Sequence, residues 1–308
     1  MKMKQADRAS VLVHGYAKIN LHLDITGRLD GGYHSVETVM QTVSLSDDVI
    51  LTRTQGMNKG GFSLLCDVAG VPTDERNLAV RAAKLFCERT GVREGVEIEI
   101  RKRIPMAAGL AGGSADAAAT LLGMNQLYGE PLTIEELCAL GSALGADVPF
   151  CIVGGTAYAD GRGDVLHDFP KMPDCFLVVA CAGEGVSTPW AYGRLDRLHA
   201  DFGEQSDYRP RGVEVLRDAL AHADLSRMAS AMYNIFESPV LAERPVAVQI
   251  RQTLLDAGAL GAMMSGSGPS VFGVFDDREV AEAAAGKLAE LNLPSYVCHP
   301  IETAEGVC

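Results

Sequence analysis

A glycine-rich segment at residues 105–114 constrains the fold of this chain more than any other feature, because it joins a strand pattern directly to a helix pattern. Residues 96–100 alternate apolar and acidic side chains with the period of a half-buried strand. Residues 114–128 are mostly strong helix formers, and Gly129 ends the run. The order of these patterns predicts a strand, a glycine-rich turn and a helix in immediate succession.

Three glycines suggest what this turn binds. Gly109, Gly112 and Gly113 permit backbone angles and close approaches that a Cβ would block, so consecutive amides can point inward and hold phosphate oxygens. Ser114 would lie at the helix N-terminus, where its hydroxyl can cap the helix or face a phosphate and Mg²⁺. No lysine follows the last glycine and the G-x-G-x-x-G spacing is absent, so this is neither a Walker A loop nor a dinucleotide fingerprint. The alternative is a tight turn whose glycines serve only packing.

Two charged residues stand in apolar surroundings. Asp147 lies between a helix end and the apolar run 148–153, where partial desolvation suits a carboxylate to act as a base if a cation keeps it ionised. Lys18 lies inside an apolar strand region, and lysines are seldom buried unless paired. It could offset the charge of Asp147 and neutralise a transferring phosphoryl group. The alternatives are a turn aspartate and a solvated lysine.

Two turns complete the candidate sites. Tyr33 and His34 follow the glycines of a turn and could contact a substrate, although aromatic residues are common in turns. Residues 265–270 form a second glycine-rich turn that leads into a strand, for which a plain hairpin turn is the alternative.

Composition excludes several classes of protein. Of the 308 residues, 47% are hydrophobic and 22% charged, which is typical of a globular chain with a filled core. The net charge of −13 argues against nucleic acid or an anionic membrane as a partner. The eight cysteines form no CxxC pair or zinc pattern, and no signal peptide or membrane-spanning run is found. We therefore expect a soluble, cytoplasmic protein with reduced thiols.

The order of predicted elements, strands followed by helices and then the same again, indicates two α+β domains, 1–168 and 169–308. The predicted strands are 10–17, 19–25, 36–43, 49–54, 96–100, 176–180, 271–275 and one near Tyr296. The predicted helices are 78–88, 114–128, 133–144, 190–198, 213–222, 246–257 and 279–291.

Together these segments resemble the GHMP kinases, the family of galactokinase, homoserine kinase, mevalonate kinase and phosphomevalonate kinase. The three family motifs occur in order at residues 17–21, 105–119 and 264–272. Four local signatures resemble the branch that phosphorylates a cytidylyl methylerythritol, and they lie at residues 17–23, 30–34, 144–149 and 185–188. The resemblance implies an N-terminal ribosomal-protein-S5-like domain, a C-terminal ferredoxin-like domain, and transfer of the ATP γ-phosphate to a tertiary hydroxyl.

The resemblance also assigns site residues. Asp147 would be the catalytic base and Lys18 its charged partner, while Tyr33 and Tyr192 would sandwich the cytosine ring and His34 would contact it. Mg²⁺ would be held through the phosphates, with Ser114 as the one candidate protein ligand. The ATP-binding residues would be Pro105, Met106, Ala107, Ala108, Gly109, Leu110, Ala111, Gly112, Gly113, Ser114 and Ala115. The substrate-binding residues would be Asn20, Tyr33, His34, Thr188, Tyr192, Ser265, Gly266, Ser267 and Gly268.

The loop departs from the family pattern, because alanine stands at 107, 108 and 111 where many members carry a glycine, and Ala115 replaces a frequent serine. Alanine fits there if the backbone avoids left-handed angles. The turn before Tyr33 also has an extra glycine. Two other functions remain open: a homoserine or mevalonate type of kinase, in which Tyr33, His34 and Tyr192 would be idle, and a non-catalytic nucleotide-binding protein of the same fold. The chain is expected to be a monomer or a homodimer.

Overall fold

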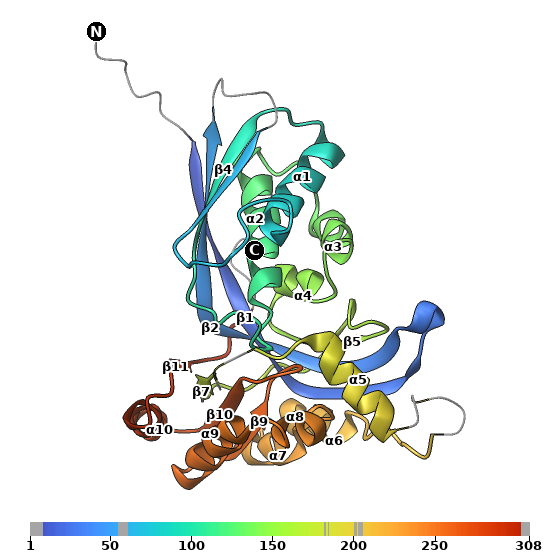
Figure 1. The fold of residues 1–308 in the computed structure, drawn as a ribbon, viewed down its shortest axis with the longest axis vertical. Helices are drawn as coiled ribbons and strands as arrows, with labels where there is room; N and C mark the ends of the chain where they lie inside the picture. Colours follow the sequence, from blue (N-terminus) through green and yellow to red (C-terminus); the bar gives the residue numbers. More distant parts are fainter. Residues whose placement is uncertain are drawn as a thin grey trace.

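The computed structural model describes residues 9–54, 61–181, 183, 185–199, 202 and 206–302. Two sheets organise the fold, and the long strands β1 (Ser10–Arg28) and β2 (His34–Thr54) belong to the first sheet and curve past the second (Figure 1). The chain therefore has the mixed α+β class expected from its sequence. Among the described residues, no helix combines the length and apolar character that a membrane span requires.

The first sheet is built around the antiparallel β1–β2 pair, in the order β3-β4-β2-β1-β8, and a β5–β6 hairpin extends it from β2. The shorter strands are β3 (Phe62–Cys66), β4 (Gly95–Arg101), β5 (Thr156–Asp160), β6 (Val165–Asp168) and β8 (Tyr233–Asn234). The sequence pattern predicts β4 and misses the other four, which are short and lack a clear alternation of apolar and polar residues.

The breaks predicted within β1 and β2 are wrong. The irregular spacing near Lys18 is a shift in strand register, which β1 absorbs without ending. Residues 44–48 have the polar composition of a turn, yet they continue β2: Asp47 pairs with Gly15 and Asp48 with His14 on β1. Buried partners for their side chains, described below, explain why polar residues occupy the interior of this strand.

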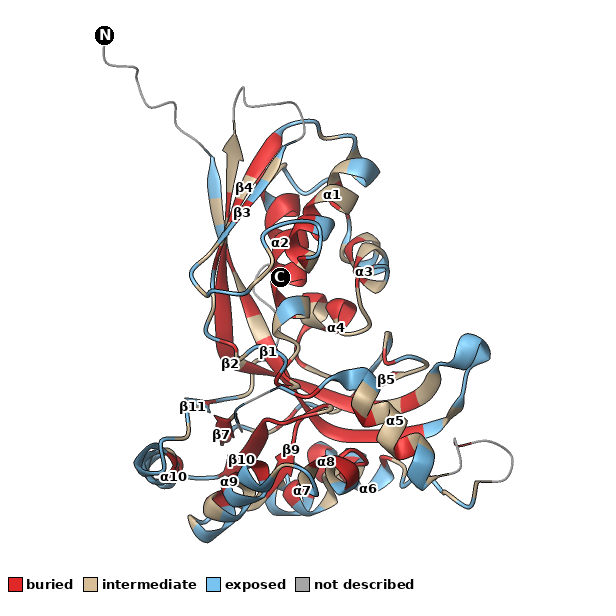
Figure 2. Ribbon diagram, viewed as in Figure 1, coloured by how far each residue is buried: buried red, intermediate tan, exposed pale blue. Residues whose placement is uncertain are grey.

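Four helices cover one face of the first sheet (Figure 1): α1 (Leu78–Thr90), α2 (Gly112–Leu127), α3 (Ile134–Ser142) and α4 (Val148–Val153). Asn77 caps α1 and Gly91 ends it in a left-handed conformation, as the sequence predicts. The predicted capping box of Thr133 and Glu136 starts α3. The central helix α2 is buried on most of its surface (Figure 2), which its small alanine side chains allow.

The second sheet is antiparallel in the order β11-β7-β10-β9, with strands β7 (Phe176–Ala180), β9 (Gly261–Met264), β10 (Val271–Phe275) and β11 (Ser295–Cys298). Its helices are α5 (Thr188–Leu198), α6 (Glu214–Ala221), α7 (Leu225–Ala231), α8 (Glu237–Leu241), α9 (Pro245–Asp256) and α10 (Arg278–Glu290). The longer elements begin and end within two residues of their predicted bounds. The short elements α7, α8 and β9 are not predicted.

A cluster of buried hydrophobic residues connects the two halves of the chain. Ala17 and Leu21 of β1 belong to the same buried cluster as Val179 of β7 and Phe272 of β10. The chain also crosses between the sheets, because β8 pairs with β1 and the Ile301 amide donates to the Thr42 carbonyl at 2.9 Å. The division into domains 1–168 and 169–308 stays a prediction.

Three charged side chains lie beneath the start of the glycine-rich segment. The fully buried Asp47 accepts hydrogen bonds from the backbone amides of Arg103 and Ile104, the latter at 2.8 Å. The Lys102 ammonium pairs with Asp47 and also with Asp116 of α2, at 2.8 Å to Asp116 Oδ2. These contacts fix the strand end, β2 and the first turn of α2 relative to one another, and so position the loop between them.

Asp116 should make stability depend on pH. Burial raises its pKa to about 7, and the neighbouring charge of Asp47 adds to the effect while Lys102 opposes it. An unfolded aspartate titrates near about 3.9, so the folded chain binds more protons between about pH 4 and pH 7 and its stability falls as pH rises through that window.

The Asp116→Asn variant lacks this titration. The free energy of unfolding of the variant minus that of wild type should therefore increase by about 1–4 kcal/mol between about pH 4 and about pH 7, and stay constant above that. Urea denaturation across this pH range measures both free energies. Asp218→Asn, on the exposed face of α6, serves as the control and should show no such trend. A constant difference between Asp116→Asn and wild type at every pH would contradict the assignment.

Candidate active site

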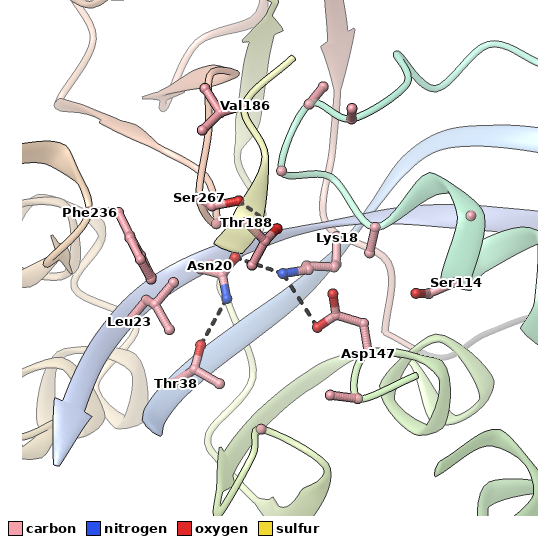
Figure 3. Close-up of a pocket in the computed structure, with 18 of the residues that line it drawn as sticks. Lys18, Asn20, Leu23, Thr38, Ser114, Asp147, Val186, Thr188, Phe236 and Ser267 are labelled. Carbon is pink, nitrogen blue, oxygen red and sulfur yellow. Dashed lines mark hydrogen bonds and ion pairs between the residues drawn. The ribbon is translucent and has the colours of Figure 1, made fainter. Parts of the chain in front are cut away.

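A cavity of about 560 Å³ lies between the glycine-rich loop, β1, and the starts of α4 and α5. Its wall contains residues of β1 and β2, of the turn that joins β9 to β10, and of other segments far apart in the sequence (Figure 3). The predicted site residues found in the wall are Lys18, Asn20, Ala107, Ala108, Gly109, Ala111, Gly112, Gly113, Ser114, Asp147, Thr188, Tyr192, Gly266 and Ser267.

Lys18 and Asp147 meet in this cavity. The Lys18 Nζ lies 3.6 Å from Asp147 Oδ1, and the lysine side chain is only 6% exposed while the aspartate is 36% exposed. Lys18 lies in β1, and Asp147 is the residue immediately before α4. The Lys18 backbone amide also donates to the Leu110 carbonyl at 3.2 Å, which ties the strand to the glycine-rich loop. A buried ammonium and a more exposed carboxylate thus face the same space beside the loop.

A chain of hydrogen bonds orients Lys18 from below (Figure 3). Lys18 Nζ donates to Asn20 Oδ1 at 2.8 Å, and Asn20 Nδ2 donates to Thr38 Oγ1 at 2.8 Å. Thr38 in turn donates to the His22 carbonyl at 2.7 Å. Because the Asn20 amide nitrogen donates to Thr38, the side-chain carbonyl oxygen of Asn20 faces the Lys18 ammonium. Thr38 was not predicted from the sequence, since a threonine within a strand pattern carries no distinguishing signal.

The glycine-rich loop contains left-handed residues, including two alanines. Ala107, Gly109 and Ala111 have φ values of 50°, 78° and 57°. The expectation that alanine avoids left-handed angles in this loop is therefore wrong at 107 and 111. Such turns direct backbone N–H groups into one concave surface suited to an anion. Ala111 is the residue that precedes α2, so Ser114 does not cap the helix but lies in its first turn, in the cavity wall.

The second glycine-rich turn packs directly on the first. Ser265 Oγ donates to the Gly109 carbonyl at 2.9 Å, and the Ser270 amide donates to the Ala108 carbonyl at 3.2 Å. Asn234 of β8 supports the turn from behind by donating to the carbonyls of Met264 and Gly266. Ser265 is fully buried, so it holds the loop in place, whereas Gly266 and Ser267 reach the cavity.

The aromatic residues do not have the arrangement expected from the resemblance. The His34 ring stacks on Tyr192, with centroids 4.6 Å apart, and Phe236 contacts Tyr192 edge-on at 4.9 Å. Tyr33 is 61% exposed and lies near Arg162 rather than against Tyr192. Burial raises the pKa of Tyr192 to about 12, so its ring is neutral at ordinary pH.

Several predicted residues lie outside the cavity wall, and several wall residues were not predicted. Among the described residues, Leu110 and Ala115 are buried behind the loop and Met106 is half exposed; Pro105, Tyr33, His34, Ser265 and Gly268 are also absent from the wall. The unpredicted wall residues are Leu23, Val36, Thr38, Leu78, Ala146, Arg162, Gly163, Val186, Ser187 and Phe236. Most are apolar and could not be told from core residues by sequence pattern.

Comparison with known proteins agrees with this architecture. Residues 77–155 match the GHMP kinases N terminal domain, and residues 216–292 match the GHMP kinases C terminal domain. The chain is 46% identical to a 4-diphosphocytidyl-2-C-methyl-D-erythritol kinase from Synechococcus sp., over 88% of this chain and 87% of that one. It is 44% identical to the protein of the same name from Gloeobacter violaceus, over 94% of each.

Solved structures give the same result at the level of the fold. The crystal structure of a 4-(cytidine 5'-diphospho)-2C-methyl-D-erythritol kinase superposes with a TM-score of 0.78 at 32% identity, covering 94% of this chain and 99% of that one. A homoserine kinase from Cytophaga hutchinsonii superposes with a TM-score of 0.72 at 23% identity, covering 99% of each chain. The second likeness concerns the fold alone.

The contact between the two glycine-rich turns should be sensitive to a single methyl group. A Cβ on Gly109 would lie 2.2 Å from the Ser265 carbonyl oxygen, a backbone atom, so Gly109→Ala must push the two turns apart. We expect the KM for ATP to rise about tenfold or more, because the loop amides lose their arrangement.

Gly129→Ala is the matched control. Gly129 has a similar φ of 82°, but a Cβ at this position would meet nothing within 4 Å, so the substitution introduces backbone strain without a clash. It should cost about 1 kcal/mol of stability and leave the KM for ATP unchanged. Steady-state kinetics and thermal denaturation of both variants measure this. Similar KM values for ATP in the two variants would contradict a role for the Gly109 contact.

Proposed function

The chain belongs to the 4-diphosphocytidyl-2-C-methyl-D-erythritol kinases of the GHMP family, and we propose that it transfers the γ-phosphate of ATP to the 2-hydroxyl of 4-diphosphocytidyl-2-C-methyl-D-erythritol, giving the 2-phosphate and ADP. This reaction is a step in non-mevalonate isoprenoid precursor biosynthesis. The observation that carries the proposal is the Lys18–Asp147 pair, which faces the cavity beside a loop suited to phosphates.

Asp147 is the group that receives the proton of the acceptor hydroxyl. A tertiary alcohol is a weak acid and a crowded nucleophile, but phosphoryl transfer has a loose transition state in which placement matters more than prior deprotonation. The carboxylate is accessible from the cavity, and the ammonium of Lys18 lies 3.6 Å from it. As the reaction proceeds, Lys18 also offsets the negative charge that develops on the transferring group.

The triphosphate of ATP lies on the glycine-rich loop and at the N-terminus of α2. The left-handed residues of the loop and the free amides of the first helical turn provide donors for phosphate oxygens. Ser114 and Asp147 place hard oxygen atoms in the same wall, whereas in the described part of the chain no cluster of three or more side chains could hold a metal alone. This donor set fits a Mg²⁺ that keeps phosphate and water ligands and takes Ser114 as a protein ligand. When bound, Mg²⁺ neutralises phosphate charge.

The cytidylyl part of the acceptor lies at the α5 end of the cavity. Tyr192 presents a neutral ring there, and Leu23, Val36 and Phe236 add apolar surface around it. Stacking of a base on such a ring contributes about 0.5–1.5 kcal/mol. We propose that Tyr33, from the neighbouring turn, covers the other face of the base after the substrate binds. The cytoplasmic location and the choice between monomer and homodimer stay predictions.

The proposal is tested by ATP consumption with purified protein and three acceptors: the cytidylyl methylerythritol, homoserine and mevalonate. The first should support turnover and the other two should not, because they lack the base that the α5 end of the cavity would bind. Turnover with homoserine or mevalonate alone would contradict the proposed acceptor. Binding of a non-hydrolysable ATP analogue without turnover of any acceptor would contradict catalysis.

Asp147→Asn should lower kcat about 10²–10⁴-fold, the usual contribution of a general base, while the affinity for the acceptor changes little. The amide keeps the shape of the side chain but accepts no proton. Single-turnover kinetics and acceptor binding by calorimetry measure the two quantities separately. Asp218→Asn provides the same substitution at a remote exposed site and should match wild type. Near-normal turnover by Asp147→Asn would remove Asp147 from this role.

Tyr192→Ala should raise the KM for the cytidylyl acceptor about fivefold to tenfold and leave the KM for ATP within about twofold, since the ring is expected to stack on the base. Tyr192→Phe keeps the ring and should resemble wild type, which separates stacking from a role of the hydroxyl. Equal losses of affinity for both ligands in Tyr192→Ala would count against base stacking on this ring.

A further inference from the structure

We propose that Thr38 is a positioning residue for phosphoryl transfer: it holds the side-chain amide of Asn20, which in turn fixes the Lys18 ammonium, and it acts without contacting either substrate. The inference rests on the proposed function, because it concerns the rate of that transfer. Thr38 lies in the wall of the cavity. A direct contact between its hydroxyl and a substrate is therefore the alternative that the experiments must separate from positioning.

The side chains of Lys18, Asn20 and Thr38 form one hydrogen-bonded chain, which ends on the backbone carbonyl of His22 (Figure 3). The donor–acceptor distances along it are 2.8, 2.8 and 2.7 Å. The three residues are 5%, 2% and 3% exposed, in that order. Because each is buried, solvent water has little access to replace a bond that is lost.

The direction of every bond in this chain is determined by its two ends. A backbone carbonyl only accepts, so the single hydroxyl proton of Thr38 goes to His22. Toward Asn20 the hydroxyl can then only accept, which requires the amide nitrogen of Asn20 to face it. An ammonium only donates, so the amide oxygen must face Lys18. Thr38 therefore holds the Asn20 amide in the one orientation that Lys18 can use.

A shift in strand register brings Thr38 next to Asn20. Side chains alternate between the two faces of a regular strand, so residues three apart would point to opposite faces. Asn20 and Leu23 nevertheless both lie in the cavity wall, because the pairing of β1 with β2 shifts between Asn20 and His22. Thr38 pairs with Leu23, and its bond to the His22 carbonyl lies at the shift itself. The same hydroxyl thus joins the irregular part of β1 to the Asn20 amide.

The contact with Asn20 is the one that fixes the ammonium. Lys18 Nζ lies 2.8 Å from Asn20 Oδ1 but 3.6 Å from the Asp147 carboxylate, so only the amide is at hydrogen-bond distance. Without the Thr38 hydroxyl, the buried amide nitrogen of Asn20 would have lost its acceptor, and the side chain would turn toward another one. The ammonium would then be displaced from the position in which it stabilises the transferring phosphoryl group.

The test measures kcat and both KM values, with ATP and the cytidylyl acceptor, in Thr38→Val and Thr38→Ser. Thr38→Val should lower kcat about 10–100-fold, because a small displacement of a group that acts in the transition state is costly. Both KM values should stay within about threefold of wild type, and Thr38→Ser, which keeps the hydroxyl, should restore kcat to within about threefold. A higher KM for the acceptor with an unchanged kcat would indicate a direct substrate contact and would overturn the inference.

Thr42→Val is the matched control. Thr42 lies on the same strand, is also 3% exposed, and is the residue of β2 that pairs with Lys18. Its hydroxyl has no hydrogen-bond partner within the described part of the chain, so the substitution removes no bond. The variant should therefore keep the kcat of wild type. A loss in Thr42→Val equal to that in Thr38→Val would reveal a general packing effect and contradict positioning.

A double-mutant cycle shows whether Thr38 acts through Asn20. Asn20→Ala should lower kcat by itself, since it removes the amide that holds Lys18. If Thr38 has no other role in the transfer, adding Thr38→Val to Asn20→Ala should change kcat by less than about twofold. If the two losses multiply in full, Thr38 acts independently of Asn20, and the inference is wrong.

Neutron diffraction from unmodified protein keeps the inference testable if the variants fold poorly. The deuteron on Thr38 Oγ1 should point to the His22 carbonyl, with the Asn20 amide nitrogen facing Thr38; a deuteron directed at Asn20 would contradict the inference. Absence of turnover with the cytidylyl acceptor in wild type would reject the proposed function instead. The deuteron positions do not depend on which acceptor is used, so the two failures are distinguishable.

Discussion

The account depends on an ion pair between two distant parts of the chain, the Lys18 ammonium on β1 and the Asp147 carboxylate before α4, 3.6 Å apart. An ammonium that is 6% exposed would be costly to bury alone, and here it has both Asp147 and the Asn20 carbonyl oxygen as partners. The carboxylate remains accessible from the cavity. The pair therefore combines a buried, fixed positive charge with a half-buried carboxylate, which is the arrangement that the proposed transfer of a phosphoryl group to a hydroxyl requires.

The position of the glycine-rich loop is fixed by contacts from other parts of the chain. Asp47 and Lys102 hold its start from below, and the turn at residues 265–270 packs against its middle through Ser265 and the bare Cα of Gly109. Since that second turn is held by Asn234, the loop geometry depends on both sheets together. Contacts around the loop offset the backbone strain of the two left-handed alanines, which is about 1–3 kcal/mol for each.

The sequence predicted site residues correctly where a residue type is unusual for its local sequence. Lysine in an apolar strand, aspartate before an apolar run and glycines between a strand and a helix all predicted the site, and the structure brings them together around one cavity. It failed where the deciding contact was not local. Residues 44–48 look like a turn until the buried partners of Asp47 are known, and the left-handed angles of Ala107 and Ala111 have no signal in the local sequence. The contact of His34 with Asp196 joins segments that no sequence pattern relates.

The most direct test of the central claim is a crystal structure of the protein with a non-hydrolysable ATP analogue and 4-diphosphocytidyl-2-C-methyl-D-erythritol. The account predicts that the 2-hydroxyl lies within about 3.2 Å of the Asp147 carboxylate, with the γ-phosphate between that hydroxyl and the loop and in contact with Lys18 Nζ. A hydroxyl more than about 5 Å from Asp147, or a triphosphate bound away from the glycine-rich loop, would contradict it.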